Sequence, residues 1–243
     1  MKKHITITGL AIIVSSSIAS AQSWKKLTKD VGSKVESVKG GTGLSEEEVG
    51  AGLKEALTQG VEKGVAQLSQ ADGYFKDPQI KIPMPDEAVK VEEKLRSLGQ
   101  GEKVDEAILS MNRAAEDAAS SAKDLFVAAI KGMTITDAMN ILKGDNDAAT
   151  SYLRKSTNSA LIEKFRPIIK VSLDRVGATK HWETVFSTYN KVPFVDKVNP
   201  DLEEYVTEKA ISGLFIQVAK EELQIRKDPA ARATDLLKKV FGN

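Results

Sequence analysis

The stretch from residue 45 to residue 68 reads SEEEVGAGLKEALTQGVEKGVAQL, and its pattern indicates the fold class. Ser45 followed three residues later by Glu48 matches the capping box that begins a helix, and the acidic residues between them suit the positive end of a helix dipole. From there the apolar residues recur at steps of three and four, which predicts one face of a helix of about six turns. These residues are Val49, Leu53, Leu57, Val61, Val65 and Leu68.

Two glycines, Gly60 and Gly64, lie one turn apart beside this apolar face. A glycine inside a helix costs roughly 1 kcal/mol relative to alanine, so the fold needs a compensating gain. We expect that gain to come from close packing of a neighbouring helix against the two glycines.

Helical spacing continues over most of the chain. The first predicted helices run from Asp86 to Gly99, from Val104 to Gly132, either straight or bent at Ser120–Ser121, from Thr134 or Thr136 to Lys143, and from Ala148 to Lys155. The later ones run from Leu161 to Val176 with a kink or restart at Pro167, from Thr179 through Tyr189, from the cap pair Asn199–Pro200 through Val218, and from Asp228–Pro229 through Phe241. Three prolines exclude a helix in residues 71–85, where Ile80, Ile82 and Met84 alternate. We therefore predict an all-α, single multi-helix domain with a short extended Pro-containing connector lying on the core.

The N-terminus predicts export. An apolar run from Ile5 to Ile18 follows two lysines and precedes the small residues Ala19-Ser20-Ala21, as in a secretory signal peptide. The run is shorter than the roughly 20 residues of a membrane span, which makes an uncleaved anchor the weaker alternative. We expect cleavage after Ala21 and a periplasmic or secreted product. The chain has no cysteine, which excludes a disulfide and a lipoprotein-type anchor.

Three regions then follow from the sequence: residues 1–21 as a signal peptide, 22–44 as a basic amphipathic helix with a glycine-rich tether, and 45–243 as a helical domain. The second region places apolar residues from Trp24 to Val38 at helical steps, with lysines opposite. Both ends of the mature chain are basic and the middle is acidic. We interpret Trp24, Lys25, Lys26 and Lys29 as a surface for an anionic membrane or a partner; the alternative is that this helix folds back onto the acidic middle.

The residues suited to catalysis are few. Without the signal peptide the chain has one histidine, His181, and no cysteine, which excludes Cys/His nucleophile pairs and multi-histidine metal sites. Asp145-Asn146-Asp147 resembles the opening of a calcium loop but lacks its glycine and glutamate. The adjacent acidic pairs at 203–204 and 221–222 point about 100° apart on a helix, and we interpret both pairs as solvated surface. We predict no catalytic residue, no metal site, no cofactor and no nucleic-acid partner.

Asn112, Arg113 and Glu116 form the candidate binding site. They lie in the sequence Asn112-Arg113-Ala114-Ala115-Glu116, where residues three apart can pair on one side of a helix while alanines admit another helix or a ligand. The alternative is an interhelical ion pair or a solvated helix face.

Several distinctive motifs follow one another along the chain: SEEE leading into GLKEAL, IKIPMP, MNRAAE, MTITDAMNILKG, DAATSYLR, KVPFVDKVNPDLEEYV and ARATDLLKKVFG. Together, in this order, they resemble the bacterial domain-of-unknown-function family numbered 4197, over about residues 24–243. The resemblance implies exported helical proteins of the bacterial envelope, and it supplies no activity, cofactor or catalytic residue.

The function we expect is non-enzymatic binding of an envelope component or partner protein by an exported helical protein. Two alternatives remain at this point. One is a carrier that holds an apolar small molecule or lipid between helices, in room left by Gly60, Gly64, Ala115, Ala118 and Ala122. The other is a hydrolase that uses carboxylates alone.

Overall fold

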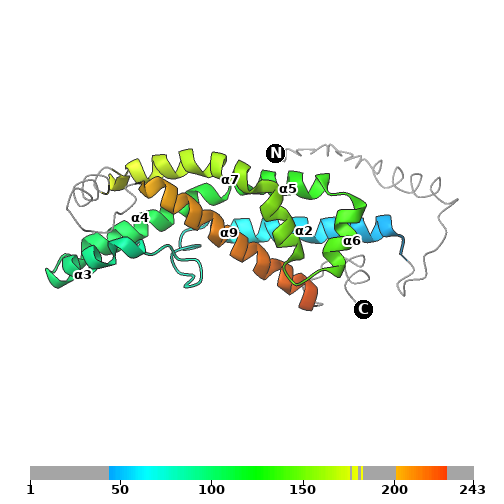
Figure 1. Cartoon of the computed structure of the whole chain (residues 1–243), viewed down its shortest axis with the longest axis horizontal. Helices are drawn as coiled ribbons and strands as arrows, with labels where there is room; N and C mark the ends of the chain where they lie inside the picture. Colours follow the sequence, from blue (N-terminus) through cyan, green and yellow to red (C-terminus); the bar gives the residue numbers. More distant parts are fainter. Residues whose placement is uncertain (1–43, 176, 180–181, 183–200, 229–243) are drawn as a thin grey trace, which may run out of the picture. The chain divides into compact units, whose positions relative to one another are not determined.

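The structure is a computed structural model, and it describes residues 44–175, 177–179, 182 and 201–228 (Figure 1). All of these belong to one compact unit, residues 40–243. The predicted signal peptide, the basic region before residue 44, His181, the Asn199–Pro200 pair and the last helix lie outside the described residues.

The described residues form helices and no strand, which confirms the all-α prediction. Seven α-helices are described over their full length: α2 (Glu46–Leu68), α3 (Val89–Ser97), α4 (Gly101–Ala119), α5 (Ala122–Gly132), α6 (Ile135–Lys143), α7 (Ala148–Arg175) and α9 (Leu202–Lys227). A short 3-10 helix, η1 (Asp86–Ala88), leads into α3. Among these, no single helix is long and apolar enough to cross a membrane. Only the pair α5 and α6, taken together, meets this criterion by length and composition, and the chain bends by 103° between the two helices.

Capping residues begin two of the helices as expected. The side chain of Ser45 accepts a hydrogen bond from the backbone N–H of Glu48, whose carboxylate accepts one from the N–H of Ser45 at 2.8 Å. Thr134 and Asp137 form the same capping box at α6, which decides between the two threonines considered there. These contacts confirm that local sequence signals set both helix starts.

Three of the predicted helices differ from the observed ones. The helix predicted from Val104 to Gly132 is divided at Ser120–Ser121 into α4 and α5, and the predictions at α7 and α9 also differ. α7 is one helix of 28 residues that contains Pro167, where the sequence suggested two segments. Proline removes one backbone N–H and crowds the carbonyl four residues before it. Both Pro167 and Glu163 lie on the exposed side of α7, so water can solvate the freed carbonyl and the helix continues. α9 is capped by Asp201 and begins at Leu202, later than the Asn199–Pro200 pair predicts.

The core forms around α9, which packs against α2, α4 and α7 (Figure 1). Phe215 of α9 meets Phe126 of α5 edge to face, with ring centroids 5.7 Å apart. A Cβ atom at Gly60 would lie 3.0 Å from Cδ1 of Ile225, and one at Gly64 would lie 3.3 Å from Cγ of Gln217. The expected close packing of a neighbouring helix against the two glycines is confirmed, and α9 is that helix.

Candidate functional site

Asn112 of α4 holds the connector, residues 71–85, against the core. Its side chain is fully buried and makes two hydrogen bonds to one residue of the connector. The Oδ1 atom accepts from the N–H of Ile82 at 2.9 Å, and Nδ2 donates to the carbonyl of Ile82 at 2.8 Å. The amide group thus takes the place of a neighbouring strand for the extended segment, and the buried backbone polar groups of Ile82 are satisfied.

Glu116 lies one turn further along α4 and binds the start of the connector. Its carboxylate is 4% exposed, and Oε1 accepts the backbone N–H groups of Tyr74 and Phe75 at 3.0 and 3.2 Å. Its Oε2 accepts from Arg113 at 2.6 Å. A buried carboxylate requires such donors, because an unpaired charge in the interior is costly.

Arg113 extends the cluster to the turn at Asp72. Its guanidinium donates to Oδ1 of Asp72 at 2.7 Å, and Lys76 pairs with the same carboxylate at 2.8 Å. The hydrogen bonds from Lys76 and Arg113 lower the pKa of Asp72 below its ordinary value. Asp72 has a φ of 71°, a left-handed conformation that non-glycine residues adopt rarely.

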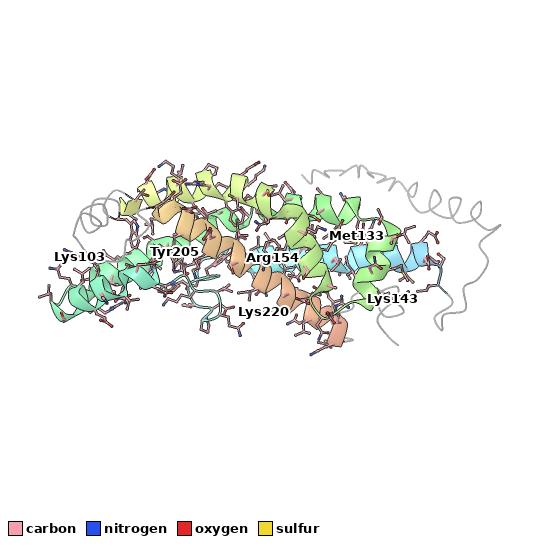
Figure 2. The ribbon with its side chains drawn as sticks, in the orientation of Figure 1. Lys103, Met133, Lys143, Arg154, Tyr205 and Lys220 are labelled. Atoms are coloured by element: carbon pink, nitrogen blue, oxygen red, sulfur yellow. The ribbon has the colours of Figure 1, made fainter. Side chains whose placement is uncertain are left out.

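Helix α9 holds the other side of the connector. The hydroxyl of the fully buried Tyr74 donates to the carbonyl of Ala210 at 2.8 Å, and burial together with the charge of Glu116 raises its pKa. Figure 2 labels two further anchors on α9: Lys220 pairs with Asp77 at 2.7 Å, and the hydroxyl of Tyr205 donates to the carbonyl of Pro83 at 3.1 Å. The connector is therefore fixed between α4 and α9.

The predicted binding cluster thus has a definite partner within the chain. We call Asn112, Arg113 and Glu116 the polar clamp, because all three bond to the connector. Asn112 and Glu116 are buried, while Arg113 is 37% exposed at its side chain. The pairing of Arg113 with Glu116 on one side of the helix is as expected, but its partner segment is the connector rather than another helix. Contact of the polar clamp with a separate ligand stays a prediction.

A second buried polar group joins three helix ends. Glu222 of α9 accepts the backbone N–H groups of Ala149 and Thr150, at the start of α7, at 3.0 and 2.8 Å. Arg226 pairs with Glu222 at 2.8 Å and donates to the carbonyl of Ile141 in the last turn of α6 at 2.8 Å. Glu222 lies at the positive, N-terminal end of the α7 dipole, and Arg226 lies at the negative, C-terminal end of the α6 dipole. The pair therefore stabilises both helix ends.

The interpretation of the 221–222 pair as solvated surface is wrong. Glu221 and Glu222 are 5% and 4% exposed. Their side chains do point to different sides of α9, but that helix has neighbours on both sides. Glu222 meets α7, and Glu221 meets α2, where Lys63 pairs with it at 2.7 Å. Both acids are buried because α9 lies at the centre of the bundle, and a local sequence pattern does not reveal that position.

A hollow on the outer surface lies between α4 and α7. Its volume is about 460 Å³, and it is lined by Asp117, Pro167, Ile168, Val171 and Arg175. Val171 is 60% exposed. None of the predictions from the sequence included this surface. Val171 lies off the buried stripe of its own helix, and an apolar residue beside the stripe is the signal that would have found it.

The remaining site predictions concern metals and the N-terminal surface. In the described part of the chain, no group of three acidic or histidine side chains is placed to hold a metal ion. Trp24, Lys25, Lys26 and Lys29 lie before the first described residue, so their predicted role stays a prediction.

The described residues define an all-α domain whose interior polar groups hold a connector and two helix ends. The chain belongs to the family described as Protein of unknown function (DUF4197), which matches residues 43–242. No curated protein and no solved structure matches the chain. The resemblance found in the sequence motifs is confirmed over nearly the whole helical domain.

Proposed function

We propose that this protein is an exported, periplasmic helical protein that binds a partner protein or another component of the bacterial envelope and catalyses no reaction. The observation that carries the proposal is the contrast between the interior and the surface of the domain. In the interior, Asn112, Glu116 and Glu222 use their oxygen atoms to accept backbone N–H groups. On the surface, α7 presents exposed apolar and basic side chains beside a hollow.

The interior contacts support structural roles for the groups that acid–base chemistry would need. A carboxylate that accepts two backbone N–H groups and an arginine has most of its lone pairs engaged. Glu116 and Glu222 each have this set of donors. The small residues offered for the carrier alternative are closely packed: Ala115, Ala118 and Ala122 are fully buried, and α9 occupies the space beside Gly60.

Export is supported by the N-terminal sequence alone. The apolar run and the small residues before Gln22 have the features of a cleaved signal peptide. N-terminal sequencing of the protein purified from the periplasm of its source bacterium should begin at Gln22. A chain that begins at Met1 would contradict both cleavage and the assigned compartment.

Native mass spectrometry of the same preparation tests the binding role. We expect masses above that of the mature chain, from a bound protein or another envelope component that is released under denaturing conditions. The bare chain alone, at protein concentrations where its fold is intact by circular dichroism, would contradict the proposal. A bound apolar small molecule would favour the carrier.

The basic region at residues 22–44 has its own test, since it is proposed to meet an anionic membrane or partner. Liposome flotation should compare the mature protein with a chain that starts at Ser45. If Trp24 and the nearby lysines bind the bilayer, only the longer chain floats with anionic vesicles, and added salt releases it. Equal behaviour of the two chains would remove the membrane-surface role.

A further inference from the structure

Four residues of α7 form a row that includes Ile168, Val171 and Arg175 of the α4–α7 hollow and begins one turn before it, at Lys164. Lys164, Ile168, Val171 and Arg175 are spaced by four, three and four residues, so they share one face of the helix. At 1.5 Å per residue, the two charged residues lie about 16 Å apart along the axis, with the two apolar residues between them. The row is therefore an apolar centre with a cation at each end.

The two end cations are available to an external group. Within the part of the chain that the structure describes, neither Lys164 nor Arg175 forms an ion pair. Their basic neighbours on α7 differ in this respect. Arg166 pairs with Asp201 and Glu203, and Lys170 pairs with Asp174. Between residues 164 and 175 of α7, the positive charge without an ion pair thus lies at the two ends of the row.

The shape of the surface narrows the class of partner. The apolar residues line a hollow about 460 Å³ in volume. A bilayer is flat on this scale and is bound by apolar side chains that protrude into it, whereas the side chains on one face of a helix can fill such a hollow. Charge complementarity with the two end cations requires acidic residues on that helix.

We infer that the α4–α7 hollow is a docking site for an acidic amphipathic helix of a partner protein. This inference rests on the binding role proposed above. About three turns of that helix cover the row, with apolar side chains on Ile168 and Val171 and an acidic residue near each end cation. Asp117 forms the opposite wall and accepts the hydroxyl of Ser172 at 2.6 Å. Its negative charge repels acids, so those of the docked helix lie on the α7 side.

Site-specific photo-crosslinking in the source bacterium tests the inference on the full chain. A photoreactive amino acid replaces Val171, and in a matched control it replaces Lys155, which is exposed on the same helix outside the hollow. Adducts are digested and their attachment points sequenced. We expect an adduct at position 171 and not at 155, attached to a segment with acidic residues and apolar residues at helical spacing.

A second variant tests the charges. The double substitution Lys164→Glu and Arg175→Glu should lower the yield of the adduct at 171 by at least about tenfold, because attraction at both ends becomes repulsion. Circular dichroism melting should match that of the parent chain, since both residues are exposed. An unchanged yield would overturn the inference.

Adducts of other kinds at position 171 would contradict docking of an acidic helix. A lipid adduct would mean that the surface meets the membrane, and an adduct with a second copy would mean self-association; either result overturns the inference, as does no adduct. Native mass spectrometry separates failure of the site from failure of the function. A bound partner in that measurement, without an adduct at position 171, would preserve the binding role and place it on another surface.

Discussion

Replacing Glu116 by alanine should destabilise the protein because the connector loses one of its two buried anchors on α4. The substitution leaves the backbone N–H groups of Tyr74 and Phe75 without the carboxylate that accepts them. A buried donor that loses its partner costs about 1–3 kcal/mol, and the N–H of Tyr74 is in that position. Phe75 is only partly buried, so its N–H costs less.

Arg113 contributes a smaller share of this loss. Its side chain is 37% exposed and keeps its bond to Asp72, so the cation is neither buried nor unpaired after the substitution. A partly exposed ion pair is worth under about 1 kcal/mol. The combined cost is about 3 kcal/mol, which corresponds to a fall in melting temperature of about 6–12 °C for a protein of this size.

Thermal denaturation followed by circular dichroism measures this effect, and two variants make it specific. Glu116→Gln keeps an oxygen acceptor but loses the charge, and should cost about half as much, since hydrogen bonds to neutral groups are weaker. Glu106→Ala, at an exposed position of the same helix, should change stability by less than about 0.5 kcal/mol. The reasoning is refuted if Glu116→Ala melts within 2 °C of the parent or if glutamine and alanine cost the same.

Three further changes test other parts of the fold. Gly60→Leu should destabilise by about 1–3 kcal/mol in urea denaturation, because its side chain would meet α9, whereas Gly132→Leu, with no atom within 4 Å of an added Cβ, should be near neutral. Glu222→Ala should cost about 3–5 kcal/mol by leaving the buried N–H groups of Ala149 and Thr150 without their charged acceptor, against under about 0.5 kcal/mol for the exposed Glu208→Ala. The pKa of Asp72 is lowered in the folded state, so its contribution to stability is present above the unfolded pKa near 4 and is lost as the pH falls through the folded value. Asp72→Asn keeps a residue that tolerates the left-handed conformation and should flatten the acid side of the stability profile; an unchanged profile would contradict the assigned pairing.

Helix positions could be predicted from the sequence because their signals are local. The capping box at Ser45, the glycine after Lys143 and the apolar steps of α2 depend on residues within one or two turns. Pro167 led to the wrong boundary in α7 because only its local effect can be seen in the sequence. Its local effect is to weaken a helix, but the flanking turns of α7 pack against α4, α5 and α9 and keep the helix continuous.

The polar clamp could be predicted only in part. Its residues stand out as polar side chains among alanines, and the three-residue spacing of Arg113 and Glu116 indicates their pairing. Their partners lie 30 to 42 residues away in the connector, and the bonds of Asn112 and Glu116 go to backbone atoms of Ile82, Tyr74 and Phe75. Any residue has such backbone groups, so no side-chain pattern identifies the partner segment.

The adjacent acids at 221 and 222 show how charge patterns depend on position in the fold. On a helix with one buried side, two neighbouring acids are solvated at little cost, and the pattern then indicates surface. α9 instead has α2 on one side and α7 on another, so each acid faces a different interior contact. The contacts are favourable because each carboxylate meets donors: a lysine from α2, or the N–H groups at the start of α7. Two adjacent glutamates can therefore lie on an exposed surface or at a buried helix junction, and the number of helices packed around them decides which.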